Sequence, residues 1–302
     1  MRKFGISRNA SFILYMIAAM LVLLLLLPPL PTLAAEAMPL PTASGTLTKK
    51  TDKAIIDYSN TADGYVMVQY TTQSAKRLKV QVKGPKTTYT YDLPAQKWVT
   101  FPLSDGNGDY KITVFQNTTD NKYATVVSAS VKVTLSDEFA PFLRPNQYVD
   151  YASAANTIKK AAELTKDETD ALKKVDKIYN FVVNNLTYDT EKAKTVASGY
   201  LPVLDSVLAA KKGICFDYAS LMTGMLRSQG IPCKLVVGYA GTAYHAWISV
   251  WTKETGWIDN AIYFNGTDWQ RMDPTFASSG KKSESIMKYI GDGKNYTTKY
   301  LY

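Results

Sequence analysis

The stretch "GICFDYASLMTGMLRSQGIPCKLVVGYA" (213–240) contains both cysteines of the chain, Cys215 and Cys233. After Cys215, apolar residues recur at three- and four-residue steps. This spacing predicts a helix that begins at or just after Cys215 and ends at Gly230. Its inward face would carry four residues: Tyr218, Met222, Met225 and Leu226. The apolar run "KLVVGYA" (234–240) then predicts a strand.

A thiol at a helix start is chemically favoured as a nucleophile. Unpaired backbone N–H groups and the helix dipole place partial positive charge there, which stabilises the thiolate. A free cysteine is also a common small core residue, so Cys215 alone leaves both interpretations open. A disulfide with Cys233 is disfavoured, because the helix between them would span about 21 Å. We predict Cys233 to be a buried residue at the start of the following strand.

The chain has one histidine, His245, in the predicted strand "HAWISVWT" (245–252). A metal site built on several imidazoles is therefore excluded, and no calcium loop of EF-hand type occurs, so we expect no metal or other cofactor. An imidazole close to Cys215 would lower the pKa of the thiol and act as base, then acid. A packed, half-buried ring is the alternative for His245.

The imidazole must also be kept in the correct tautomer by a hydrogen-bond acceptor at its second nitrogen. Asp273, in "RMDPT" (271–275), is our candidate, with a simple turn as its alternative role. Asp259, in "GWIDNA" (256–261), is nearer to His245 in sequence but stands at an expected bend. We favour Asp273.

Three blocks together resemble the transglutaminase-like superfamily, the papain-related cysteine enzymes. These are 213–240, "HAWISVW" (245–251) and "WQRMDPTF" (269–276), and the likeness covers roughly residues 145–280. The resemblance implies that Cys215 is the nucleophile, His245 the base and Asp273 its orienting partner.

The resemblance also suggests supporting roles. Gly213 would permit the tight turn into the helix. The backbone N–H of Cys215 and an upstream polar side chain would stabilise an oxyanion. For that side chain we take Tyr188, in "NLTYD" (185–189), whose alternative is a packed aromatic role. Asp217 would tie the loop beside the site or, as we prefer, cap the helix.

The chain begins with features of an export signal. Arg2, Lys3 and Arg8 precede the uncharged apolar run 11–27, and small residues near Ala37 form a cleavage site. We predict that residues 1–37 are a signal peptide, with an uncleaved membrane anchor as the alternative. Residues 38–50, rich in Pro, Thr and Ser, read as a flexible linker.

Residues 51–135 show strand patterning. The segment 79–83 alternates polar and apolar residues, and turn signals such as "KGP" (83–85) recur at intervals near ten residues. Six or seven short strands at this spacing predict an immunoglobulin-like antiparallel β-sandwich.

Residues 136–302 predict an α+β, transglutaminase-like domain, with helices followed by an antiparallel sheet. Thr165 and Glu168 have the spacing of a capping box. Apolar residues at helical spacing follow them: Leu172, Val175, Ile178, Tyr179, Val182 and Leu186. A further helix is expected from Asp205 to Lys212, with Gly213 as its stop. Beyond 233–252, strands are expected in "WIDNAIYF" (257–264) and "WQRMDPT" (269–275).

These features predict an exported bacterial enzyme that acts on carboxamide or peptide bonds through a thioester, ending in hydrolysis or transglutamination. The alternatives are an inactive scaffold that binds the cell wall or a protein, and an assembly factor. The net charge of +9 suits an anionic wall polymer, or simply a solvated surface. The sequence has no run of Lys and Arg with interleaved aromatic residues, so we expect no nucleic-acid partner. We expect a protein or peptide substrate, and membrane attachment only if the signal stays uncleaved.

Overall fold

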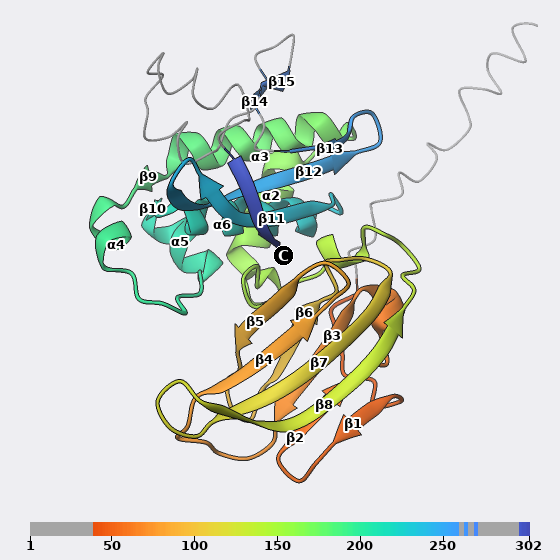
Figure 1. Cartoon of the computed structure of the whole chain (residues 1–302). Coiled ribbons are helices and arrows are strands. Elements are labelled where there is room, and N and C mark those ends of the chain that lie inside the picture. Colours follow the sequence, from red (N-terminus) through yellow and green to blue (C-terminus); the bar gives the residue numbers. More distant parts are fainter. Residues whose placement is uncertain (1–38, 260–262, 265–268, 271–295) are drawn as a thin grey trace, which may run out of the picture. The chain divides into compact units, whose positions relative to one another are not determined.

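The computed structural model describes residues 39–259, 263–264, 269–270 and 296–302 (Figure 1). All of them belong to one of the two units into which the chain divides, Ala37–Tyr302. The predicted signal peptide, 1–37, lies outside the described residues. Among the residues that are described, no helix has the length and apolar character needed to cross a membrane.

The N-terminal β region, residues 48–133, consists of two four-stranded antiparallel sheets (Figure 1). In the order in which they pair, the strands of the first sheet are β1 (Thr48–Lys50), β2 (Ala54–Asp57), β3 (Tyr65–Tyr70) and β6 (Trp98–Pro102). Those of the second are β5 (Thr88–Asp92), β4 (Leu78–Lys83), β7 (Gly108–Asn117) and β8 (Tyr123–Val133). A short 3-10 helix, η1 (Thr61–Asp63), precedes β3.

Alternation in the sequence explains how these sheets bury one face. In β4, Val80 and Val82 are fully buried and pair with Val114 and Ile112 of β7. Burying each such side chain stabilises the fold by about 1.5–3 kcal/mol. The rings of Tyr91 in β5 and Phe101 in β6 lie 4.9 Å apart, which joins the two sheets in one apolar core.

Residues 51–135 contain seven strands, β2 to β8, in agreement with the six or seven predicted. One detail differs from expectation: a further strand, β1, occupies the end of the stretch expected to be a flexible linker. Lys49 of β1 pairs with Ile56 of β2, a backbone contact that the Thr/Lys-rich composition of this stretch does not reveal. The immunoglobulin-like assignment stays a prediction.

The α+β region follows two 3-10 helices, η2 (Ala140–Phe142) and η3 (Tyr151–Ser153). Its helices are α2 (Ala155–Thr165), α3 (Ala171–Asn185), α4 (Thr190–Thr195), α5 (Leu204–Ala210) and α6 (Cys215–Ser228). An antiparallel sheet comes after them, in the order β13 (Gly256–Ile258), β12 (Ala243–Thr252), β11 (Cys233–Ala240) and β16 (Tyr296–Leu301). The predicted class, helices first and antiparallel sheet after, is confirmed.

Two short strand pairings complete the region. β9 (Thr187–Tyr188) pairs in parallel with β10 (Lys212–Gly213), just before α6. β14 (Tyr263–Phe264) pairs with β15 (Trp269–Gln270).

Helix α6 is the centre of the region, because every residue from Asp217 to Arg227 is buried. It contacts α2, α3, α5, β11 and β12. The four residues predicted to face inward, from Tyr218 to Leu226, are fully buried. At Gly224 an added Cβ would stand 2.6 Å from Leu204 Cδ1, so the absence of a side chain lets α5 approach closely. Helix α6 is therefore fixed on nearly all sides.

Two predicted helix boundaries were wrong. Helix α3 is capped by Asp170, whose Oδ1 accepts from the N–H groups of Leu172 and Lys173, and not by a Thr165–Glu168 capping box. Thr165 instead ends α2, and its hydroxyl donates to the Ala161 carbonyl. A carboxylate one residue before the helix is the better placed cap.

The second error concerns the end of α5. Lys211 ends the helix in the left-handed conformation, with φ 50°, two residues before the glycine that we expected to stop it. Gly213 lies in β10 instead.

Arg227, buried in α6, connects this helix with three other segments. Its Nε donates to the Cys233 carbonyl at 2.9 Å, Nη1 to the Arg144 carbonyl at 2.7 Å, and Nη2 to the Tyr302 carbonyl at 2.6 Å. Burial lowers the pKa of the guanidinium to about 10. These bonds hold Tyr302, beyond β16, against the central helix.

Candidate active site

Cys215 is the first residue of α6, as predicted, and its thiol is free and half-buried. The turn that precedes it depends on Gly213, where an added Cβ would stand 2.6 Å from Asp217 Cβ. The Asp217 carboxylate occupies that space and accepts the Ile214 N–H at 2.8 Å. The thiol therefore stands at a helix N-terminus, where the dipole favours a negative charge.

His245 lies in β12, directly opposite Gly238 of β11. The imidazole is 7% exposed and stacks with the Trp247 ring, at 6.4 Å between centroids and 23° between planes. An added Cβ at Gly238 would collide with the Thr297 carbonyl and the Trp247 ring. The glycine thus allows β16 and the Trp247 ring to approach β11, the strand that pairs with the one carrying the imidazole.

Cys215 and His245 line the same cavity, of about 610 Å³. Helix α6 and strand β12 pack on each other, which brings the thiol and the imidazole to one place. The remaining wall is rich in aromatic side chains, six of which are Tyr148, Tyr188, Tyr200, Phe216, Tyr244 and Tyr302. A cavity with apolar ring faces and few polar groups suits a substrate carbonyl that must be held out of bulk water.

Tyr188, predicted as an oxyanion donor, lies in β9 and lines the cavity. Backbone bonds fix its position beside the turn before Cys215: the Thr187 N–H donates to the Lys211 carbonyl at 2.9 Å, and the Asp189 N–H to the Gly213 carbonyl at 2.8 Å. The donor role itself stays a prediction.

Asp217 is fully buried and caps the first turn of α6 through the Ile214 N–H. Its carboxylate also accepts from Lys192 Nζ at 2.7 Å and from the Tyr200 hydroxyl at 2.6 Å. Sequence reasoning missed Lys192 and Tyr200, because no local pattern pairs a lysine in a short helix with a carboxylate in another helix.

Asp273, the predicted partner of His245, lies outside the described residues. Asp259, the rival, is exposed at the end of β13. Its neighbour Ile258 pairs with Val250 of β12, which is five residues, or about 16 Å, along the strand from His245. This register places Asp259 away from the imidazole.

Cys233 is free, fully buried and the first residue of β11, as predicted. Its Sγ lies 3.5 Å from Thr223 Oγ1. Burial raises the pKa of this thiol to about 12, so Cys233 is a poor nucleophile.

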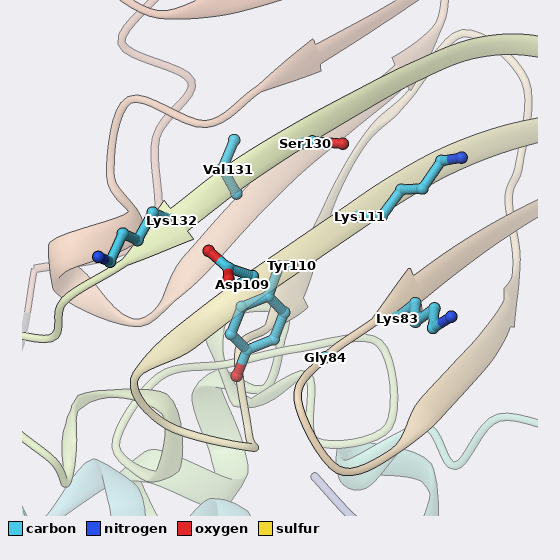
Figure 2. Close-up of a pocket in the computed structure, with 8 residues that line it drawn as sticks. All are labelled: Lys83, Gly84, Asp109, Tyr110, Lys111, Ser130, Val131 and Lys132. Atoms are coloured by element: carbon cyan, nitrogen blue, oxygen red, sulfur yellow. The ribbon is translucent and has the colours of Figure 1, made fainter.

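A second depression, of about 390 Å³, lies on the β region (Figure 2). Lys83 of β4 pairs with Lys111 of β7, while Asp109 pairs with Lys132 of β8. Its eight described lining residues include no cysteine or histidine, so it offers charged side chains but neither a thiol nor an imidazole. Within the described ranges, His, Cys, Asp and Glu side chains form no group of three or more that could hold a metal ion.

Comparison with known proteins points to one family. Residues 158–274 match the model of the transglutaminase-like superfamily. YebA of Bacillus subtilis, an uncharacterised protein, is 30% identical over 118 residues, which cover 32% of this chain and 16% of that protein. A protein-glutamine gamma-glutamyltransferase of Pseudomonas aeruginosa is 29% identical over 105 residues, 30% of this chain and 14% of that protein.

Among solved structures, the periplasmic domain of TgpA from Pseudomonas aeruginosa is similar with a TM-score of 0.37 and 18% identity. The match covers 82% of this chain and 80% of that one. By contrast, YebA and the gamma-glutamyltransferase are each matched over less than a fifth of their own length.

Proposed function

The α+β region of this chain belongs to the transglutaminase-like superfamily, and from that premise we propose that the chain is an exported cysteine enzyme of acyl transfer. Its substrate is a carboxamide or peptide bond, and its intermediate is a thioester on Cys215. One observation carries the proposal: the thiol at the start of α6 and the imidazole of β12 line one cavity.

In the first step, His245 takes the thiol proton and the Cys215 thiolate attacks the substrate carbonyl carbon. A C–S bond forms, and the carbonyl π electrons move to oxygen. The backbone N–H of Cys215 and the Tyr188 hydroxyl are the candidate donors to that oxyanion. The positive end of the helix dipole favours the thiolate before the attack.

In the second step, the carbonyl re-forms and the C–N bond breaks. The imidazolium donates its proton to the departing nitrogen, so ammonia or an amine leaves and the thioester remains. Water or a second amine then attacks the thioester, with His245 taking the proton of the acceptor. The C–S bond then breaks and the imidazolium returns its proton to the sulfur, which leaves a carboxylic acid or a new amide and the free Cys215 thiol.

Asp273 completes this proposal as the acceptor that orients the imidazole. The role comes from its place in the family motif "RMDPT". Removal of residues 1–37 during export would place the enzyme outside the cytoplasm, where a protein or peptide substrate, including one in the cell wall, is available.

The test is incubation of the purified chain with a primary-amine probe and a glutamine-containing peptide, followed by mass spectrometry. Amine incorporation, deamidation or peptide cleavage that is lost in Cys215→Ala supports the proposal. Cys233→Ala is the matched control, since it removes the chain's other thiol and is expected to retain activity. Equal product with wild type and Cys215→Ala, or none with either, would contradict the proposal and favour a binding scaffold.

A further inference from the structure

A buried ionic cluster stands behind the candidate nucleophile. The Asp217 side chain is fully buried, and its two oxygens accept three hydrogen bonds. One donor, Ile214 N–H, belongs to the turn before α6. The other two, Lys192 and Tyr200, come from the segment that begins with α4. A buried carboxylate needs such partners, because burial penalises its charge heavily.

Lys192 is the cation of this cluster. Its Nζ is 2.7 Å from Asp217 Oδ2 and 2.6 Å from the Tyr200 hydroxyl, and it lies 4.1 Å from the centre of the Tyr200 ring. Burial lowers the pKa of this ammonium, but the hydrogen bonds to Asp217 and Tyr200 outweigh it and the net shift is upward. Lys192 is therefore charged at neutral pH and balances Asp217.

The same contacts fix one wall of the cavity. Residues 196–200, with Ala193, line the cavity beside Cys215. The Tyr200 ring also meets the Phe216 ring edge-on at 6.4 Å. Lys192 and Tyr200 thus join the wall segment to the first turn of the helix that carries the thiol.

We propose that Lys192 and Tyr200 are positioning residues for Cys215. Lys192 neutralises Asp217 at the N-terminus of α6, and the two side chains together hold the cavity wall against the first turn of that helix. The inference rests on the proposed role of Cys215 as nucleophile. An unbalanced carboxylate in the first turn would oppose the formation of a thiolate two residues away. With Lys192 in place, the helix dipole and His245 act on the thiol without that opposition.

Several other groups face the thiol. From the elements packed around the cavity, the described titratable or charged groups are His245 and Tyr244 of β12, Tyr188 of β9, Tyr148, Tyr302 and the Asp217–Lys192–Tyr200 cluster. The tyrosines are neutral near pH 7, since a phenol has an ordinary pKa of about 10. Lys212 of β10 and Asp189, which follows β9, form an ion pair at 3.2 Å and balance each other. The cluster, the imidazole and this ion pair are therefore the charged groups to consider around Cys215.

The test is the pH profile of iodoacetamide alkylation of Cys215, followed by mass spectrometry of the peptide that contains it. Lys192→Met is expected to move the profile upward by about one pH unit, which slows alkylation about tenfold below the pKa of the thiol. Lys192→Arg keeps the charge and is expected to restore the wild-type profile. Lys194→Met is the matched control, because Lys194 lies in the same helix and pairs with the exposed Glu191.

Tyr200→Phe keeps the ring but removes the hydroxyl, and is expected to shift the profile in the same direction by a smaller amount. This variant decides the question if Lys192→Met does not fold. Variants that fold and follow the wild-type pH profile would overturn this inference. The proposed function would still stand, as long as wild-type Cys215 is alkylated faster than a peptide thiol. A wild-type Cys215 that is alkylated no faster than a peptide thiol would overturn both.

Discussion

Gly238 lies directly opposite His245 in the pairing of β11 with β12, and the space where its side chain would stand is filled by the Thr297 carbonyl and the Trp247 ring. The placement of the imidazole therefore depends on a residue with no side chain. Strands β11, β12 and β16 and the Trp247 indole meet at this point of the sheet.

This relationship predicts the effect of Gly238→Ala. The added methyl must push β16 or Trp247 away, so we expect a loss of about 2–3 kcal/mol in the free energy of unfolding and a strong loss of activity. Urea unfolding and the amine-incorporation assay measure the two effects.

Gly45→Ala is the control for the glycine substitution itself. Gly45 has φ +74° and open space around the Cβ position. Its substitution is expected to cost about 1 kcal/mol of backbone strain while activity is unchanged. Equal effects of the two substitutions would contradict the role given to Gly238.

The three carbonyl bonds of Arg227 lead to a second prediction. Arg227→Met keeps an unbranched apolar chain but removes the guanidinium donor from the carbonyls of Arg144, Cys233 and Tyr302. The Tyr302 carbonyl keeps one donor, the Leu235 N–H. We expect a loss of about 3–5 kcal/mol in the free energy of unfolding, measured by urea denaturation.

Arg77→Met is the matched control for this variant. The Arg77 guanidinium also donates to a backbone carbonyl, that of Asp120, but it does so at the exposed surface. A change within about 0.5 kcal/mol is expected there. Similar losses for the two arginines would show that burial of Arg227 does not matter.

Sequence patterns predicted the parts of this molecule that local periodicity determines. Alternation at Lys79–Lys83 corresponds to β4, and the apolar spacing after Cys215 corresponds to α6, with the thiol at its first position. The boundary errors at Thr165 and Gly213 arose because another residue a few positions away, Asp170 or Lys211, starts or ends the helix.

The contacts around the site required the structure. Lys192 and Tyr200 reach Asp217 only because α4 and the segment after it fold back onto α6. Arg227 likewise has partners from three separated segments. No periodicity or short motif encodes such pairs, because they depend on how elements far apart in sequence are packed.

Cys233 leads to a prediction about alkaline pH. Burial raises the pKa of its thiol to about 12 in the folded chain, against about 8.5 for an unfolded one. Above the unfolded pKa the unfolded chain releases this proton while the folded chain keeps it. The stabilising contribution is therefore present below about pH 8.5 and is lost progressively towards about pH 12.

The measurement is urea unfolding at about pH 8 and about pH 10.5, where the thiol alone accounts for a loss of about 2–3 kcal/mol. Cys233→Ala should remove that part of the pH dependence, and Cys215→Ala, a change at a half-buried position, serves for comparison. An unchanged slope in Cys233→Ala would show that its thiol does not ionise as described.

The central claim is that the Cys215 thiol is activated by the one imidazole of the chain, and the rate of its alkylation by iodoacetamide near pH 7 tests this most directly. We predict that wild-type Cys215 reacts about tenfold faster than a peptide thiol, as expected for a thiolate stabilised by a helix N-terminus and a neighbouring imidazole. His245→Gln is expected to reduce the rate towards that of the peptide. A wild-type rate equal to that of the peptide, or a rate unchanged by His245→Gln, would contradict the account.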